Sequence, residues 1–292
     1  MEKRSARLRW VGFVLPMFAI YALFFIYPVI RTAYYSFTDW NGLTSRFVGL
    51  YNFKRLFQDE RVITALKNTF LYSGVITVVQ NTVGLGLAVL ANMKIKNIKL
   101  IRLLYFMPAV FSPLVLGYVW KYMLEPNFGV VNTFLDTIGL SMLEQDWLGN
   151  PSIGVWMIIL YTVWQYAGYS MVIYLAGLQG VDASLIESAS IDGASGWSKF
   201  KNVTFPLIAP SFTLNIVLTL ITSMKLFDQI FVLTYGGPGS STNSMATLVY
   251  IAGFSGGQEW GYGTAMSVVL FVIIALFASI VVTKLRSREV EM

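Results

Sequence analysis

Six apolar segments recur along this chain, and their length limits what it can fold into. A helix needs about 20 predominantly apolar residues to cross the hydrocarbon core of a bilayer. Only 12% of the residues are charged, whereas soluble domains carry about 25%. The sequence therefore predicts an all-α membrane protein with six transmembrane helices, at Val11–Ile30, Thr69–Ala91, Ile101–Met123, Ile153–Leu178, Ser211–Leu233 and Tyr262–Thr283.

The first segment follows a basic start, a pattern that secretory signal peptides share. Its apolar stretch is longer than a typical signal-peptide core, it has no small-residue cleavage site, and Arg31 is expected to end it. We therefore expect a retained anchor helix. In the third segment, Pro108 and Pro113 should kink the helix and free carbonyls that neighbouring helices must satisfy. Small residues in the second segment should allow close helix packing; they are Gly74, Gly84, Gly86 and Ala88.

The chain contains no cysteine and no histidine. This excludes disulfides, Cys/His zinc sites, thiol nucleophiles and imidazole acid–base catalysis. No G-x-x-x-x-G-K-[ST] nucleotide-binding motif is present either. We expect no catalytic residues, no metal and no cofactor on this chain; if ATP drives it, ATP and magnesium belong to another subunit.

The distribution of basic residues predicts the topology. The N-terminus, the 92–102 loop and the C-terminal tail are basic, whereas the 124–152 and 234–261 loops contain no lysine or arginine. Cytoplasmic loops carry an excess of Lys and Arg, so both termini and the 179–210 loop should be cytoplasmic in a multi-pass protein of the cell (plasma or inner) membrane. The first outer loop, which is also basic, is an exception. Because these charges lie beside apolar spans, they do not indicate a nucleic-acid partner.

The polar run Leu185–Pro210 separates the fourth and fifth segments. Ser184 and Glu187 have the spacing of a capping box at a helix start, and Leu185, Ile186 and Ala189 supply an apolar face. Gly193 and Gly196 should end this helix and permit a turn, followed by a second short amphipathic piece at Trp197–Val203. An ordinary amphipathic loop at the membrane surface would show some of these signals.

At these residues the sequence resembles a known family. The pattern Glu187-Ser188-Ala189, Asp192-Gly193-Ala194, Phe200 and Phe205-Pro206 is similar to the "EAA" loop of ABC importer permeases, with departures at Ser188 and Phe205. The resemblance implies a type I importer permease fold in which this loop is a cytoplasmic coupling helix that fits a cleft of the ATP-hydrolysing subunit. The implied coupling residues are Glu187, Ala189, Asp192, Gly193, Ala194, Phe205 and Pro206.

Lys225 and Asp228 lie three residues apart in the fifth segment, hence on one face of a continuous helix. Charges at membrane depth usually face a bundle interior or a water-filled cavity. The pair could line the translocation path, or it could be a structural ion pair near the outer end of the helix.

An aromatic and polar cluster in the fourth segment has two interpretations. Aromatic faces beside hydroxyl and amide groups suit sugars, but an aromatic belt at the membrane surface has the same composition. The cluster comprises Thr162, Trp164, Gln165, Tyr166 and Tyr169.

A third pattern makes the resemblance more specific. The stretch from Phe227-Asp228 to Gly236-Gly237-Pro238, followed by Thr242 and Thr247, looks like the fifth-helix exit of carbohydrate-uptake permeases of the maltose-permease type. The phrase Gly49-Leu50-x-Asn52-Phe53 resembles sugar permeases weakly. Aligned on Glu187 and Pro206, the substrate positions implied by the resemblance are Thr162, Trp164, Tyr166, Tyr169, Thr219 and Ser223, to which we add Asp228. Several of these differ in type from the maltose relative, which leaves the sugar open.

The sequence thus predicts a permease subunit of an ATP-driven carbohydrate importer, for a disaccharide, an oligosaccharide or a related compound. The family implies a second homologous permease, two ATPase subunits and an extracellular solute-binding protein as partners. The expected organisation is an anchor helix and outer loop at 1–68, a permease core at 69–285 with its coupling loop at 182–206, and a cytoplasmic tail at 286–292. The alternative is an autonomous secondary transporter or channel that uses Lys225 and Asp228.

Overall fold

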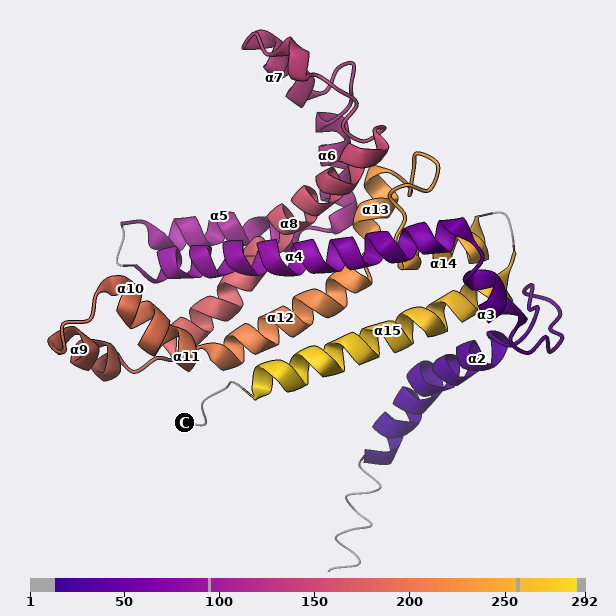
Figure 1. The fold of residues 1–292 in the computed structure, drawn as a ribbon, viewed down its shortest axis with the longest axis horizontal. Helices are drawn as coiled ribbons and strands as arrows, with labels where there is room; N and C mark the ends of the chain where they lie inside the picture. The colour runs from indigo at the N-terminus through magenta and orange to yellow at the C-terminus, as the bar shows by residue number, and fades with distance from the viewer. Residues whose placement is uncertain (1–13, 94–95, 256–257, 288–292) are drawn as a thin grey trace, which may run out of the picture. The chain divides into compact units, whose positions relative to one another are not determined.

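The computed structural model describes residues 14–93, 96–255 and 258–287. Within these ranges the regular structure is helical, apart from an isolated antiparallel bridge between Thr38 and Phe47. The prediction of an all-α protein is therefore confirmed. Figure 1 follows the helices along the chain. Contacts divide the chain into two compact units, Met1–Glu60 with Leu248–Phe271 and Arg61–Thr247 with Val272–Met292.

The described residues contain four single helices that are long and apolar enough to cross a membrane. They are Val14–Tyr35, which includes the π-helical turn η1 (Ala22–Ile26) and α2 (Tyr27–Tyr35), then α4 (Glu60–Asn92), α8 (Pro151–Gln179) and α15 (Trp260–Arg286). Two further pairs of helices pass the same test but are sharply bent. If each bent pair is one span, the number of spans is six, as the sequence predicts.

Two boundaries differ from the prediction. Helix α4 begins at Glu60 and not at Thr69, because its polar first turns are also helical. The first helix does not end at Arg31 but continues to Tyr35, so that prediction was wrong. The Arg31 guanidinium lies 4.6 Å from the centre of the Tyr35 ring and donates to the Tyr35 hydroxyl, which accommodates the charge within the helix. The predicted start at Val11 lies outside the described residues.

The third span is broken, as its prolines predict. Helix α5 (Ile98–Val110) contains Pro108, and α6 (Pro113–Met123) starts at Pro113 after a bend of 96°. Side chains of α8 satisfy carbonyls at the break: the Tyr161 hydroxyl donates to the carbonyl of Pro113 at 2.6 Å, and Gln165 Nε2 donates to that of Phe111 at 3.3 Å.

The fifth span is not one helix, which corrects the prediction of a continuous Ser211–Leu233. Helix α12 (Ala209–Met224) ends at Met224, residues 225–227 leave the helical path, and α13 (Asp228–Leu233) follows. The buried Ser244 hydroxyl donates to the carbonyl of Leu226 at 2.6 Å. A hydrogen bond from a distant loop therefore replaces the one that the helix gives up at this point.

Two of the predicted loops contain helices. The Gly- and Ser-rich segment 234–261 includes α14 (Met245–Phe254), whose first amide donates to Thr69 Oγ1 of α4 at 3.0 Å. The acidic segment 124–152 includes α7 (Val130–Thr137) and the short 3-10 helix η2 (Ser141–Leu143). The hydrophobic periodicity of the sequence did not reveal α14 or α7, because turn residues and polar residues flank these short helices.

The unit formed by Met1–Glu60 and Leu248–Phe271 is fastened by polar contacts. Arg55, on α3 (Tyr51–Leu56), forms a two-point salt bridge with Glu259, at 2.8 and 3.0 Å. Hydrogen bonding to Glu259 raises the pKa of the Arg55 guanidinium, although partial burial opposes this. Asn52 Nδ2 donates to the carbonyls of Ser36 and Thr38, which pins the segment after the first helix.

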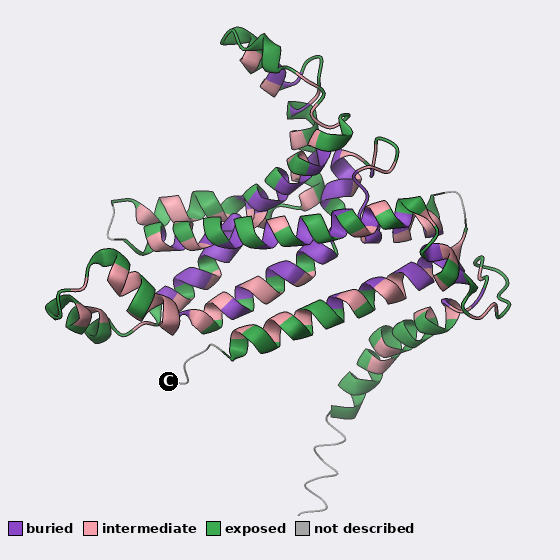
Figure 2. Cartoon of the chain, in the orientation of Figure 1, coloured by how far each residue is buried: buried purple, intermediate pink, exposed green. Residues whose placement is uncertain are grey.

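The unit formed by Arg61–Thr247 and Val272–Met292 contains two hydrophobic clusters. One joins α4, α8 and α13 around Tyr72, Ile158 and Ile230, and the other joins α4 and α8 around Ala88 and Tyr174. In Figure 2, buried residues alternate with exposed ones along α4 and α8.

Small residues set how closely these helices approach. A Cβ atom at Gly168 of α8 would lie 1.9 Å from the Tyr105 carbonyl oxygen of α5, and one at Gly84 of α4 would lie 2.5 Å from Ser170 Cβ of α8. The predicted close packing at Gly84 and at the buried Ala88 is therefore present. It is absent at Gly74 and Gly86, where nothing lies within 4 Å.

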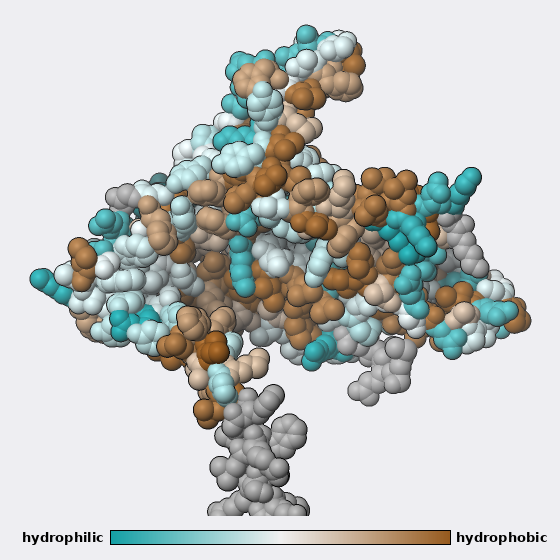
Figure 3. Space-filling view, turned by 180° about the vertical axis from the view of Figure 1, so that it is seen from behind, coloured by the Kyte–Doolittle hydropathy of each residue, from teal (hydrophilic) through white to brown (hydrophobic). Residues whose placement is uncertain are grey.

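Much of the remaining surface is apolar. Large hydrophobic side chains are exposed along the first helix, α4, α5 and α15, and hydrophobic residues cover much of the face seen in Figure 3. This is the surface expected of helices that face lipid.

Candidate functional site

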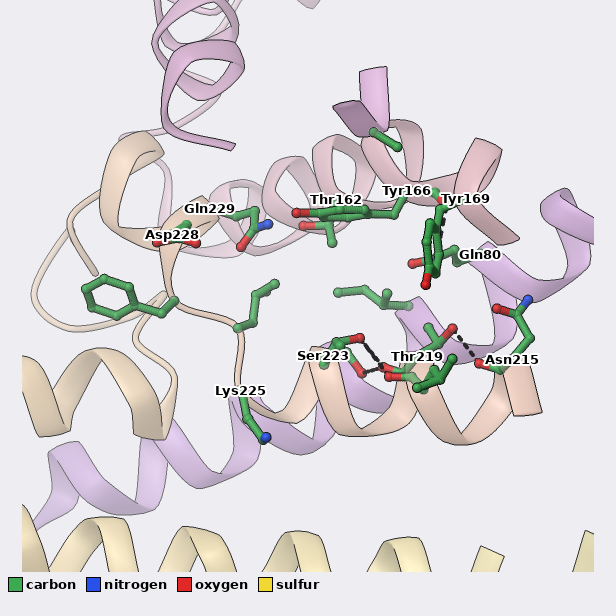
Figure 4. A pocket seen from close by; sticks show the side chains of 16 residues that line it. Gln80, Thr162, Tyr166, Tyr169, Asn215, Thr219, Ser223, Lys225, Asp228 and Gln229 are labelled. Carbon is green, nitrogen blue, oxygen red and sulfur yellow. Dashed lines mark hydrogen bonds between the residues drawn. The ribbon is translucent and has the colours of Figure 1, made fainter. Parts of the chain in front are cut away.

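A cavity of about 430 Å³ lies among α4, α8, α12 and the break in the fifth span. Figure 4 shows its side chains. Helix α8 supplies one wall, α12 supplies the facing wall, and α13 closes one end with Asp228 and Gln229. The volume falls in the range of about 300–1,000 Å³ that is typical of small-molecule sites.

Six of the seven predicted substrate positions line this cavity: Thr162, Tyr166, Tyr169, Thr219, Ser223 and Asp228. They come from three different helices, so the fold brings together residues that are far apart in the sequence. Trp164 does not line it. Its ring lies 5.4 Å from that of Trp120 on α6, and it is 42% exposed on another face of α8. The inclusion of Trp164 in the predicted pocket is therefore not supported by its position.

Lys225 and Asp228 do not share a helix face. The helix ends between them, and among the described residues they form no ion pair with each other. In Figure 4 the Lys225 side chain points away from the side of the cavity where Asp228 lies. Of the two interpretations of this pair, the structural ion pair is not supported, because the spacing argument assumed an unbroken helix. Both residues instead line the cavity.

The cavity also contains polar residues that the sequence reasoning missed, namely Gln80, Asn215, Thr222 and Gln229. A signal for Asn215 was available. It precedes Thr219 by four residues, and Thr219 precedes Ser223 by four, so the three share one face of α12. Gln80 is likewise one of a series of buried polar residues on α4, with Ser73, Thr77 and Asn81.

The Leu185–Pro210 loop folds into the two helical pieces that the sequence predicts. The residue that caps the N-terminus of the first piece is not the predicted one. Helix α9 (Ala183–Ile191) is capped by Asp182, whose Oδ1 accepts from the Ser184 amide at 2.9 Å. The capping box from Ser184 to Glu187 is therefore wrong, since Ser184 lies inside the helix. Hydrogen bonds from the Ser184 backbone and side chain lower the pKa of the Asp182 carboxyl.

Helix α9 ends in a Schellman motif built on Gly193. Gly193 adopts a φ of +76°, its amide donates to the Ser190 carbonyl at 3.2 Å, and the Ala194 amide donates to the Ala189 carbonyl at 3.0 Å. Glycine is favoured here because the left-handed conformation strains other residues. The predicted turn at Gly193 is therefore present.

The predicted coupling residues fall into two groups. Glu187, Asp192 and Gly193 are exposed, and no residue of α9 is buried, as Figure 2 shows. Phe205 and Pro206 belong to the second piece, which runs through α10 (Gly196–Lys199), the π-helical turn η3 (Phe200–Thr204) and α11 (Phe205–Leu207). There the Phe205 ring lies 5.2 Å from that of Phe212 on α12. Phe205 therefore packs the second piece against the body of the protein, whereas α9 has no buried residue.

Comparison with known proteins identifies the family. The model of the family described as "Binding-protein-dependent transport system inner membrane component" matches residues 80–290. This chain belongs to that family. It is a multi-pass membrane permease and not an enzyme, and its mostly helical structure agrees with that membership. Within the described residues, no group of three or more acidic side chains is placed to hold a metal ion.

Relatives of known description cover nearly the whole chain. The "Probable starch degradation products transport system permease protein AmyD" of Thermoanaerobacterium thermosulfurigenes is 38% identical over 96% of this chain and 94% of its own length. The multiple sugar-binding transport system permease protein MsmF of Streptococcus mutans is 32% identical over 96% of each chain. The sn-glycerol-3-phosphate transport system permease protein UgpA of Yersinia pestis is 33% identical over 89% of this chain and 88% of its own.

A solved structure supports the fold. A chain of a bacterial ABC transporter involved in the import of the acidic polysaccharide alginate superposes with a TM-score of 0.86 over 98% of both chains, at 24% identity. A permease with this fold and an inner cavity is therefore the framework for the function.

Proposed function

We propose that this chain is one of two permease subunits of an ATP-driven importer that carries a carbohydrate into the cytoplasm. The observation that carries the proposal is the cavity wall, which combines hydroxyl, amide and aromatic side chains. A saccharide offers apolar C–H faces to aromatic rings and a ring of hydroxyls to polar groups. The whole-length similarity to permeases named for starch degradation products and for multiple sugars supports the same substrate class.

The proposed orientation places both termini and α9 in the cytoplasm. The basic 92–102 loop and C-terminal tail, opposite outer loops without lysine or arginine, support it. In this orientation α9 faces the compartment that holds ATP.

The proposed socket for the ATPase is the exposed surface of α9. This short helix has a defined start at Asp182 and a defined end at Gly193, although none of its residues is buried. A helix that is capped at both ends and has no buried residue has surface available for a partner. Glu187 would anchor the ATPase surface by its charge, and ATP with magnesium would be held by the ATPase alone.

The remaining proposed partners are a second homologous permease and an extracellular solute-binding protein. The family description names binding-protein dependence. A structure of similar fold contains an alginate ABC transporter in complex with a periplasmic protein bound to an alginate pentasaccharide. An autonomous carrier based on Lys225 and Asp228 is less well supported, because the two side chains do not form a pair.

The first test is a gentle detergent pull-down of the chain from its native membrane, followed by reconstitution. We expect an ATPase and a second six-helix permease to co-purify, and the proteoliposomes to take up a saccharide when ATP and the binding protein are supplied. A chain that purifies alone and transports without ATP would contradict the proposal.

The socket is tested by charge reversal. Glu187→Lys should abolish ATP-driven uptake and weaken ATPase co-purification while leaving the permease in the membrane. The matched control is Glu144→Lys, which reverses an exposed charge in the 124–152 loop, proposed to lie on the other side of the membrane. It should leave ATPase co-purification unchanged. Equal loss in both variants, or in neither, would remove Glu187 from the socket.

A further inference from the structure

Three hydroxyl groups in the cavity wall already donate their protons to backbone carbonyls of their own helices. Thr162 donates to the carbonyl of Ile158 at 2.7 Å, Thr219 to that of Asn215 at 2.8 Å, and Ser223 to that of Thr219 at 2.6 Å. A hydroxyl has one proton and two lone pairs. Each of these three groups therefore offers only lone pairs to a ligand.

Other polar groups around the cavity are acceptors as well. Gln80 commits its amide nitrogen to Ser170 Oγ at 2.9 Å, so its oxygen is the atom left for a ligand. Asp228 brings a carboxyl group, whose oxygens accept hydrogen bonds. The Lys225 ammonium points away from the side where Asp228 lies (Figure 4). The lining also contains donors, namely the Lys225 ammonium, the Gln229 amide and the hydroxyls of Tyr166 and Tyr169.

Asn215 differs from these groups. Its side chain is 1% exposed, and among the described residues neither Oδ1 nor Nδ2 has a hydrogen-bond partner. The nearby Tyr174 hydroxyl donates its proton to Asn81 Oδ1 at 2.5 Å, so toward Asn215 it offers only a lone pair. Figure 4 places Asn215 at the end of the cavity opposite Asp228.

An unpaired buried amide requires an explanation, because leaving such a group without a partner is destabilising. A ligand hydroxyl supplies one, since it can accept from Nδ2 while donating to a neighbouring acceptor. Two adjacent hydroxyls could engage Nδ2 and Oδ1 together.

We infer that Asn215 is a substrate-recognition residue for a neutral, hydroxyl-rich sugar. This inference rests on the proposed carbohydrate import. A neutral sugar brings a proton for each acceptor in the wall.

The test uses the reconstituted importer with its own ATPase, partner permease and binding protein. Uptake is measured for maltose, maltotriose and raffinose as neutral probes, and for sn-glycerol 3-phosphate and an alginate trisaccharide as acidic ones. The Asn215→Leu variant replaces the amide by an apolar group of similar shape. We expect uptake of the neutral probes, and a rise in KM of about tenfold or more in the variant, as for the loss of a hydrogen bond in a buried site.

A second readout separates recognition from a structural role. Because the amide of Asn215 has no protein partner, Asn215→Leu should leave the Tm of the purified complex unchanged or higher. The control is Ser241→Ala, which removes another unpaired hydroxyl, outside the cavity. It should change neither KM nor Tm.

The outcomes distinguish this inference from the proposed function. If no saccharide, neutral or acidic, is taken up, carbohydrate import itself fails, and the inference falls with it. If a neutral sugar is taken up with the same KM by Asn215→Leu, or if that variant has a lower Tm, the role of Asn215 is overturned while carbohydrate import stands. Preferential uptake of an acidic probe would overturn the substrate class alone.

Discussion

The Ser244 hydroxyl donates to the carbonyl of Leu226 at 2.6 Å, and both residues are buried. The carbonyl belongs to the break between α12 and α13, beside the cavity, whereas Ser244 directly precedes α14. Two neighbours of Ser244 are held by α4: the amide of Met245 donates to Thr69 Oγ1, and Asn68 Nδ2 donates to the carbonyl of Asn243. One hydrogen bond from Ser244 thus connects the non-helical backbone beside the cavity to the segment before α14, and α4 holds that segment in place.

Replacing this serine should loosen the break. In Ser244→Ala the Leu226 carbonyl remains buried without its donor, so we expect a loss of about 1–3 kcal/mol in stability. Thermal unfolding followed by tryptophan fluorescence in detergent measures it. Ser241→Ala in the same loop is the matched control, because that hydroxyl has no partner to lose. Equal effects of the two substitutions would show that the bond to Leu226 contributes nothing.

Close packing of α5 on α8 depends on Gly168. An alanine there would place Cβ 1.9 Å from the Tyr105 carbonyl oxygen, which belongs to backbone and cannot move aside cheaply. We expect Gly168→Ala to destabilise the protein by about 1–3 kcal/mol, as for other overpacked interiors. Gly86→Ala on α4 is the control, because nothing lies within 4 Å of the new methyl group. It should be neutral or slightly stabilising; unfolding temperatures that fall equally in both variants would refute the argument.

The C-terminal turn of α9 requires a left-handed residue at Gly193. Gly193→Val should destabilise the turn by about 1–2 kcal/mol, because side chains with a Cβ strain this conformation, whereas Gly193→Asn should be tolerated much better. Nothing lies within 4 Å of the position, so the difference reflects conformation and not crowding. Hydrogen exchange of the Ala194 amide measures how often the turn opens. Similar exchange in the two variants would contradict this account.

The cap at Asp182 predicts a pH dependence of α9. Because the carboxyl pKa is lower in the folded helix than in the unfolded chain, its stabilisation is fully present above the unfolded pKa. It is lost as the pH falls through the lowered pKa. We therefore expect the α9 amides to lose protection in acid, after correction for the intrinsic exchange rate. Asp182→Asn keeps a capping acceptor that does not titrate, so its protection should not depend on pH in this way.

The membrane spans could be predicted because a helix needs about 20 apolar residues to cross a bilayer, and runs of that length are visible in the sequence. The break at residues 225–227 was not, because it contains neither glycine nor proline. Its stabilising partner, Ser244, lies eighteen residues further along the chain. Likewise Asp182 and Ser184 are both acceptable caps by type, and only the backbone geometry decides between them.

Residue type and spacing identified most of the cavity wall, but not which atoms are available to a ligand. That Thr219 and Ser223 donate to their own helix, whereas Asn215 is left unpaired, follows from hydrogen-bond geometry in the folded state. Trp164 was misplaced because a count along the chain cannot tell which face of α8 a neighbouring helix covers.

Helix α12 is unbroken from Ala209 to Met224, while the chain bends by 71° before it and leaves the helical path after it. It is therefore a stiff rod with a joint at each end. One interruption follows the second helical piece of the proposed coupling loop, and the other lies beside the cavity. If the loop transmits the ATPase motion as proposed, α12 would carry it directly to one wall of the cavity, whereas the hydrogen bond from Ser244 to the Leu226 carbonyl would hold the break itself in place.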